Sequence, residues 1–464
     1  MSKEFKTTLF IFRRDLRLGD NTALLEACRN SERVIPAFFF DPRQIDKHPY
    51  RSVPGIHFMV SSLAELDEEI QSKGGRLQVW QGKPEELLPA IIKEESIEAL
   101  YFNKDYTPFS LARDKKLALI AEQSHCAVHA SDDALLNPPG AVLKGDGTPY
   151  TVFTPFFKAA KKIPVPSPVQ FRFQDSFVAK TKSGKSLDAC KPPLEDWPEL
   201  LLQGGRTEAK KLLDAACKLS DYKEQRDFPA LPGTSHLSTH HKFGTISIRE
   251  VFHQVHDALG DEHQMISELY WRDFFSHISF HFPHVYKECF YQQYNELPWH
   301  NDKKKFAAWC EGRTGFPIVD AGMRELNATG YMHNRVRMIV ASFLTKDLHI
   351  DWRWGEKYFA QKLLDYDPAV NNGNWQWAAS TGCDAQPYFR IFNPWRQQER
   401  FDPDCIYIKT WVPELQGIPA KAIHKLAESE ARPKNYTAPI VDHHEEKEVA
   451  EDMYIETREK AKAV

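Results

Sequence analysis

The chain has 464 residues, 27% of them charged, and a formal net charge of −4, which is typical of a soluble globular protein with two or three domains. This near-neutral charge excludes a uniformly basic nucleic-acid binder, so a DNA partner would need a local basic patch. The eight cysteines are scattered without a C-x-x-C pair, and no apolar run resembles a signal peptide or a membrane span. We therefore expect a cytoplasmic protein with reduced thiols and no zinc module.

The first 128 residues alternate short apolar runs with amphipathic stretches. The runs predict buried strands, and the stretches between them predict helices. The predicted strands are 9–12, 34–40, 77–80 and 99–102, and the predicted helices are 22–29, 56–71, 84–95 and 111–122. This order predicts a Rossmann-like α/β domain with a parallel sheet covered on both faces, although the G-x-G-x-x-G fingerprint of dinucleotide binding is absent.

A proline-rich stretch at 129–205 predicts a long linker over the surface, with one short helix at 151–162. Amphipathic helices then dominate residues 206–464 and predict an all-α carboxy-terminal domain. The predicted helices are 208–218, 246–259, 267–277, 306–311, 318–326, 333–344 and 354–364. After about residue 420 the chain becomes charged, and we expect only a short tail there.

One stretch, 330–377, mixes polar and aromatic residues unlike any other part of the chain. Asn334, Arg335 and Arg337 interrupt an apolar helical pattern, and a turn is predicted at 371–373. Unpaired polar groups inside a core cost several kcal/mol. The stretch therefore either faces water or lines a pocket around a polar planar ligand, and the aromatic density favours the pocket.

Three further features carry candidate chemistry. A turn at Gly233, followed by hydroxyl residues near a helix start, could hold a phosphate, although a plain capping cluster is the more common interpretation. Glu268 lies within about one helical turn of Arg272, which by itself indicates a surface ion pair. The histidines of the HISFHFPH run have helical spacing, but no acidic or cysteine ligand joins them and Pro283 would break the helix, so we expect no metal site.

Several long motifs, in the right order, resemble one family. HNRVRM, DYDPAVNNGNWQWAASTG and FRIFNP resemble the flavin-binding core of class I photolyases in the photolyase/cryptochrome family. FRRDLRLGDN, at 12–21, resembles the amino-terminal signature of photolyases, whose α/β domain carries a light-harvesting chromophore. Without the other motifs, the arginines of FRRDLRLGDN would more simply pair with nearby carboxylates. The resemblance covers nearly the whole chain and implies that residues 206–464 form a helical FAD-binding domain.

The resemblance implies a binding site for FAD, which is active in its reduced form. Arg337 would pair with Asp365 beside the isoalloxazine, Asp367 would lie at its pyrimidine edge, and Asn371 would face N5 and favour reduced flavin. His236 occupies a position where bacterial relatives commonly have arginine. The full set implied for FAD is Tyr222, Thr234, Ser235, His236, Leu237, Ser238, Arg272, Asn334, Arg337, Asp365, Asp367 and Asn371.

The resemblance also implies a pocket for damaged DNA. Glu268 would hydrogen-bond or protonate the damaged bases, and Trp271 and Trp377 would form the aromatic walls of the pocket. Asn334 and Met338 match enzymes that act on cyclobutane dimers, whereas enzymes for the (6-4) photoproduct carry histidines there. A tryptophan chain that reduces flavin under light would consist of Trp375, Trp352 and Trp299, although tryptophans are more often plain core residues.

The implied enzyme is a monomeric light-driven lyase that repairs UV-damaged DNA with a flipped-out pyrimidine dimer and associates with the nucleoid through DNA. Phosphate contacts are expected from Arg335, Lys242 and Arg390. Phe109 and Ser110 replace the Asn-Glu pair of folate-binding relatives, and NKDYTPFSLARD (103–114) instead resembles deazaflavin-binding relatives. The resemblance therefore implies a deazaflavin antenna, with a flavin (FMN or FAD) second and folate third. The alternatives are a cryptochrome photoreceptor, a (6-4) lyase, and a helical DNA- or RNA-binding module without flavin.

Overall fold

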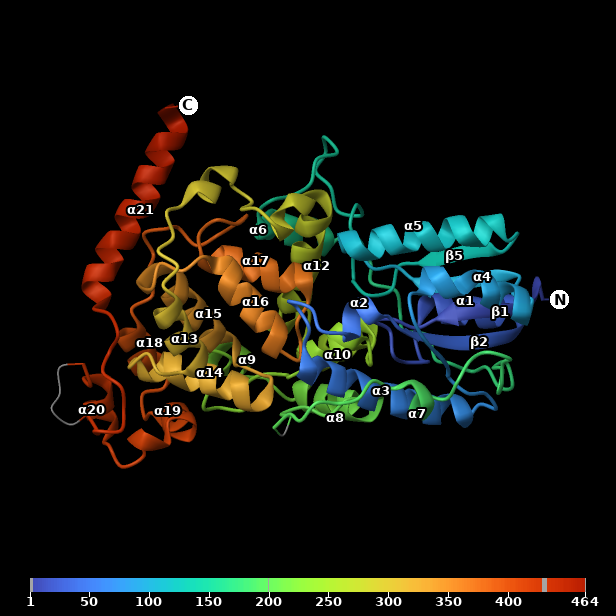
Figure 1. Cartoon of the computed structure of the whole chain (residues 1–464), viewed down its shortest axis with the longest axis horizontal. Coiled ribbons are helices and arrows are strands. Elements are labelled where there is room, and N and C mark those ends of the chain that lie inside the picture. The colour runs from blue at the N-terminus through green and yellow to red at the C-terminus, as the bar shows by residue number, and fades with distance from the viewer. Residues whose placement is uncertain (1–2, 199, 428–431, 464) are drawn as a thin grey trace. The chain divides into compact units, whose positions relative to one another are not determined.

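The computed structural model describes residues 3–198, 200–427 and 432–463 (Figure 1). Contacts divide the chain into two compact units. The first unit comprises Met1–Asp196, Leu202–Ser220 and Ser235–His281, and the second comprises Trp197–Leu201, Asp221–Thr234 and Phe282–Val464. These units follow contacts between residues that are distant in sequence, whereas the predicted boundaries at 128 and 205 follow local composition. The three-part division therefore stays a prediction.

A five-stranded parallel sheet forms the centre of the first unit, as the sequence predicted. Its order is β3-β2-β1-β4-β5, so the winding direction reverses beside β1. The strands are β1 Phe5–Ile11, β2 Ser31–Phe40, β3 Gln78–Gln81, β4 Ala99–Asn103 and β5 Ala127–Ser131. The fifth strand was not predicted, because it lies at the edge of the sheet, is mostly half-buried and lacks a strong apolar run.

Helices between the strands cover the sheet. α4 (Pro84–Glu95) and α5 (Pro108–Gln123) contribute to one apolar cluster with β1, β2 and β4. α1 (Thr22–Asn30) begins at Asn21, whose side chain accepts a hydrogen bond from the Leu24 N–H and so satisfies one of the free amides at the helix start. The other helices of this unit are α2 Pro42–Ile45, α3 Val53–Gln71, α6 Phe153–Ala160, α7 Leu187–Cys190, α8 Arg206–Ala216, α10 Ser238–Phe243, α11 Ile248–Leu259 and α12 Gln264–His281.

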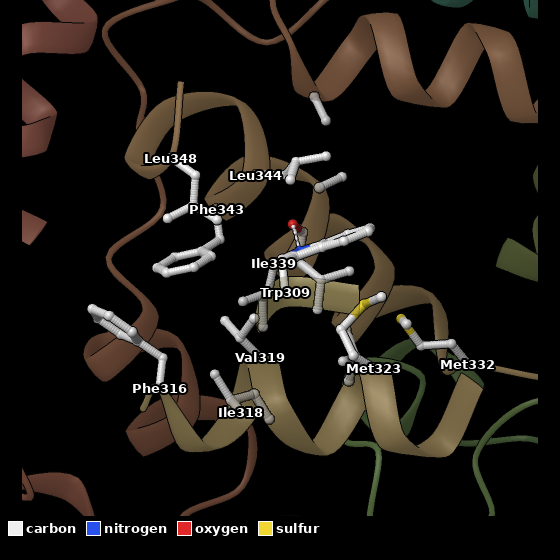
Figure 2. Packing of buried hydrophobic residues seen from close by; sticks show 14 of the residues in the cluster. Trp309, Phe316, Ile318, Val319, Met323, Met332, Ile339, Phe343, Leu344 and Leu348 are labelled. Carbon is white, nitrogen blue, oxygen red and sulfur yellow. Dashed lines mark hydrogen bonds between the residues drawn. The ribbon is translucent and has the colours of Figure 1, made fainter. Parts of the chain in front are cut away.

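The described part of the second unit is helical, as predicted for this region. Its core includes the fully buried Trp309 and Phe343, around which aliphatic and methionine side chains pack (Figure 2). The helices are α9 Tyr222–Gln225, η1 Pro283–Tyr286, η2 Gln292–Glu296, α13 Lys303–Glu311, α14 Pro317–Thr329, α15 Asn334–Ser342, η3 Phe343–Asp347, α16 Trp352–Lys362, α17 Pro368–Ala378, α18 Pro394–Phe401, α19 Ile406–Trp411, η4 Pro413–Leu415, α20 Ala420–His424 and α21 His443–Ala463.

Two local predictions are wrong. The turn predicted at 371–373 lies inside α17, whose start is fixed by Asp367 capping two backbone amides. The short tail predicted after residue 420 contains the 21-residue helix α21. α21 buries Ala450, Met453 and Tyr454, and this apolar stripe at helical spacing outweighs the charged composition. Among the described residues, no helix is long and apolar enough to cross a membrane.

Candidate functional site

In the second unit, an ion pair joins α15 to the segment before α17. Arg337 donates to both carboxylate oxygens of Asp365, at 3.1 and 2.9 Å, and its Nε donates to the Met332 carbonyl at 2.7 Å. Burial alone lowers the pKa of Arg337, but the Asp365 carboxylate outweighs burial and the net pKa is raised. The guanidinium therefore stays charged, with its plane fixed by two parallel hydrogen bonds. The predicted pair is present, although its place beside a flavin stays a prediction.

Two polar side chains at the start of α17 also have defined partners. Asp367 is the N-cap and accepts from the amides of Ala369 and Val370. Asn371 is 9% exposed, and its Nδ2 donates to the backbone carbonyl and to Oε1 of Glu356, at 3.1 and 3.0 Å. Because Nδ2 is held by Glu356, Oδ1 is the atom of this amide that can accept a hydrogen bond from a ligand N–H.

Beneath α15, a buried carboxylate supports the helix start. Glu325, on α14, accepts from the Tyr407 hydroxyl at 2.5 Å and from the His333 N–H at 3.3 Å. Burial raises the pKa of Glu325 to about 7. His333 is the N-cap of α15 and directly precedes Asn334. The Glu325 carboxylate therefore holds the backbone at the helix start, where Asn334 lies. Sequence analysis missed Glu325 because nothing in its neighbourhood distinguishes it from a surface carboxylate.

The pair expected to discriminate between lesions lies on α15, with Asn334 exposed and Met338 half-buried. The Asn334 Nδ2 lies 3.8 Å from the Met338 sulfur one turn later. Trp377 of α17 is half-buried in the same unit. Asn334 supplies an amide, and Met338 and Trp377 supply apolar surface. Their contact with a lesion stays a prediction.

The three tryptophans of the expected chain differ in burial. Trp375 and Trp352 are 2% and 1% exposed, and Trp299 is half-buried. Trp375 packs edge-on against Phe359 and Trp309, with ring centroids 4.9 and 6.2 Å apart. Two of the three tryptophans are therefore buried and the third reaches solvent, and their role in electron transfer stays a prediction.

The residues expected to bind DNA phosphates are in different environments. Arg335 is engaged internally: it pairs with Asp227 at 2.7 Å and its guanidinium lies 4.3 Å from the Phe401 ring centroid. Arg390 is exposed in the loop before α18, and Lys242 is half-buried on α10 in the first unit. Arg390 is therefore the better placed of the two second-unit arginines for a phosphate, because Asp227 already offsets the charge of Arg335.

The residues expected to hold a pyrophosphate are divided between the units. In the first unit, Ser235 accepts from the Leu237 N–H at 3.4 Å, and Ser238 begins the six-residue helix α10. His236 has a left-handed φ of +53°, and burial lowers its pKa, so its imidazole is neutral near pH 7. The second unit contains Tyr222 and Thr234, and the Thr234 side chain hydrogen-bonds Tyr331.

α12 of the first unit carries Glu268, Trp271 and Arg272. Arg272 donates to the carbonyls of Ala134 and His241, rather than only facing solvent. Trp271 stacks on Phe153, with centroids 3.6 Å apart and planes 8° apart. Sequence analysis missed Phe153, although its place in the aromatic 151–162 run was a signal that could have found it.

The motifs FRRDLRLGDN (12–21) and NKDYTPFSLARD (103–114) meet at the carboxyl ends of β1 and β4, beside the point where the winding reverses. In open α/β sheets, ligands bind at this position. Asn103 joins the motifs by donating to Asp15 at 2.6 Å. The arginines also have carboxylate partners, as the simpler interpretation required: Arg13 with Asp114 at 2.9 Å, Arg14 with Asp105 at 3.4 Å and Arg17 with Asp133 at 2.6 Å.

The histidine run forms no recognisable metal centre. α12 ends at His281, before Pro283, and the rings of His277 and His281 lie 4.5 Å apart. Across residues 3–198, 200–427 and 432–463, no group of three or more His, Cys, Asp or Glu side chains is arranged to hold a metal ion.

Two family models match the chain. One is described as DNA photolyase and matches residues 8–170, and the other is described as FAD binding domain of DNA photolyase and matches residues 265–456. A deoxyribodipyrimidine photo-lyase from Alkalihalophilus pseudofirmus is 38% identical, over 95% of this chain and 96% of that protein.

Solved structures are similar over the same length. An archaeal photolyase from Sulfolobus tokodaii, crystallised with two FAD molecules, has a TM-score of 0.89 and 43% identity, covering 97% of this chain and 100% of that chain. A cryptochrome from Synechocystis sp. PCC6803 has a TM-score of 0.87 and 29% identity, covering 98% of this chain and 100% of that one.

Proposed function

Because this chain belongs to the DNA photolyase family, we propose that it is a deoxyribodipyrimidine photo-lyase, which uses light to split cyclobutane pyrimidine dimers in DNA. The family expected from the sequence motifs is thereby confirmed. The observation that carries the proposal is the full-length similarity to a photo-lyase, in a chain whose α15–α17 region holds a paired arginine and an oriented amide.

The polar residues of α15–α17 fit a flavin. The Arg337–Asp365 pair offers a fixed charge distribution, and the Asn371 Oδ1 can accept from a protonated ring nitrogen because Glu356 holds the other end of the amide. The amide is neutral, so it does not oppose negative charge on a reduced ring. When bound near Arg337, Asp365 and Asn371, reduced FAD would supply the light-driven one-electron chemistry by which the two bonds joining the bases are split.

The chain's own residues position the substrate. Glu268 would donate a hydrogen bond or proton to the damaged bases, Trp271 and Trp377 would flank them, and Asn334 with Met338 would contact the dimer edge. Trp271 is held flat by its stack on Phe153. A preorganised aromatic surface reduces the ordering cost of binding a flipped-out dimer, which already pairs poorly in the duplex.

We propose a deazaflavin antenna in the first unit, at the carboxyl ends of β1 and β4, with FMN or FAD second and folate third. The Sulfolobus tokodaii photolyase with two FAD molecules supports a flavin as the second choice. We also propose that the enzyme is monomeric, cytoplasmic and bound to the nucleoid through DNA; the eight free cysteines support the reducing compartment. An absorption spectrum of the purified protein identifies the antenna.

The test is a light-versus-dark repair assay on an oligonucleotide that carries one cyclobutane dimer. We expect repair only under blue light, and Glu268→Ala or Trp271→Ala to retain flavin but lower the repair yield. No repair by a flavin-loaded protein would favour a cryptochrome, to which this chain is also similar. Repair of a (6-4) photoproduct instead would show that Asn334 and Met338 do not set the lesion preference.

A further inference from the structure

A fixed positive charge lies over the middle tryptophan of the expected chain. The Arg353 guanidinium carbon lies 4.8 Å from the centroid of the Trp352 ring. Trp352 is 1% exposed and the Arg353 side chain is 29% exposed, so a partly hydrated charge acts on a buried indole. No comparable cation contact is recorded for Trp375 or Trp299 among the described residues.

The guanidinium is held in place from several sides. Its Nη1 contacts both oxygens of Asp351 at 3.2 Å, its Nε donates to the Lys287 carbonyl at 2.8 Å, and its Nη2 donates to Asn295 Oδ1 at 3.2 Å. Such an arginine has lost most of its rotamer freedom and keeps one position relative to the ring. The contact is therefore part of the fold.

The amino-terminal end of α16 adds to the positive electrostatic potential at Trp352. Trp352 is the first residue of α16, and Asp351 is its N-cap, accepting from the Arg353 N–H at 2.9 Å. The start of a helix carries a partial positive charge. Asp351 opposes both positive contributions, so Arg353 and Asp351 act on the indole with opposite signs.

A cation over an aromatic face is attracted to the electrons of that face. Removing one electron makes the ring positive and turns the attraction into repulsion. We propose that Arg353 makes Trp352 the hardest tryptophan of the chain to oxidise, so that a positive charge passes through it without resting there and collects on Trp299. Arg353 acts through Trp352 and determines where in the chain the positive charge rests. The proposal rests on the expected tryptophan chain.

The electron count is simple. Trp375 gives one electron to the excited flavin, Trp352 gives one to Trp375, and Trp299 gives one to Trp352. The charge left on Trp299 is removed by one electron from an external thiol. No bond forms or breaks between these side chains, and Arg353 keeps its protons throughout.

The test uses a Trp299→Phe background, in which the charge can rest only on Trp375 or Trp352. Charge on the farther tryptophan recombines more slowly, so transient absorption reports its position as the lifetime of the tryptophan radical cation. We expect Arg353→Gln to shift the charge toward Trp352 and lengthen this lifetime by about tenfold, which corresponds to ~1.4 kcal/mol. Repair by chemically reduced enzyme should stay unchanged.

Asp351→Asn provides the matched variant, because asparagine is also a good N-cap but carries no charge. It leaves Arg353 unopposed and so keeps the charge on Trp375, and we expect a lifetime no longer than that of the Trp299→Phe parent, in contrast to Arg353→Gln. A structural disturbance would move both variants in one direction, and that result, or two unchanged lifetimes, would overturn the proposal. If Trp375→Phe still yields the radical signal, the tryptophan chain itself fails and this proposal fails with it.

Discussion

Gly355 tests how tightly Trp375, one member of the expected tryptophan chain, is packed. A Cβ at Gly355 of α16 would lie 2.1 Å from Cη2 and 2.5 Å from Cζ3 of Trp375, and 2.5 Å from Cδ2 of Leu344. Favourable carbon contacts are about 3.5–4.0 Å, so the ring would have to move by more than an ångström. Trp375 and Leu344 are 2% and 0% exposed, which leaves neither side chain room to move.

Two effects of Gly355→Ala oppose each other. Alanine gains ~1 kcal/mol over glycine in a helix interior. Overpacking a rigid core costs about 1–3 kcal/mol, and buried contacts of 2.1 and 2.5 Å place this site at the upper end of that range. We therefore expect a net loss of ~1–2 kcal/mol in the free energy of unfolding, together with slower light-driven flavin reduction, because the displaced ring is Trp375.

The assay is urea unfolding followed by circular dichroism, with flavin photoreduction measured on the same preparations. Gly417→Ala is the matched control, because a Cβ at Gly417 meets no atom within 4 Å. The control should leave both measurements unchanged. If Gly355→Ala were as stable as the parent protein, or more stable, helix propensity would have outweighed packing and the close approach to Trp375 would not constrain the site.

Three further predictions follow from the second unit. Burial raises the pKa of Glu325 to about 7, so the folded protein binds the carboxyl proton more tightly than the unfolded chain, and the free energy of unfolding falls as pH rises from about 4.5 to 7. Glu325→Gln should remove this pH dependence and stabilise the protein at pH 8 by roughly 3 kcal/mol. Urea midpoints of the variant that still fall with pH as in the parent would contradict this. Asp365→Asn should leave the charge of Arg337 uncompensated and lower the flavin-to-protein absorbance ratio after purification, and full flavin retention would exclude a binding role for the pair. Asn371→Asp should place a carboxylate against Glu356 and make the bound flavin harder to reduce, so an unchanged reduction midpoint would remove Asn371 from the flavin's surroundings.

Much of the fold was predictable because burial leaves a periodic pattern in sequence. The central strands are almost continuously apolar, since both faces of a parallel sheet are covered. The edge strand β5 is mostly half-buried, so it needs no continuous apolar run, and its sequence did not predict a strand. α17 was hidden because Asn371, Asn372 and Gly373 usually indicate a turn, whereas here the amides of both asparagines hydrogen-bond within the second unit.

The site was predictable where one motif contains both partners of an interaction, and not where the partner comes from elsewhere in the fold. Asp365 and Arg337 are 28 residues apart within one recognisable stretch, and their pairing was predicted. Phe153 stacks on Trp271 from more than a hundred residues away; its aromatic run could have singled out Phe153, but no local pattern indicates which residue it contacts. Arg353 follows Trp352 directly, yet adjacency in sequence does not show that the guanidinium lies over the ring.

Hydrogen bonds and an ion pair explain how the α15–α17 region can hold polar side chains within an apolar pattern. Polar groups at buried or half-buried positions are costly only when they lack partners. Arg337 has Asp365, Asn371 has Glu356, and Asp367 has two backbone amides. Each partner is supplied by the chain itself, so these side chains keep their orientation without a ligand. A flavin that binds here therefore meets donors and acceptors already in place, and its binding energy is not spent on ordering them.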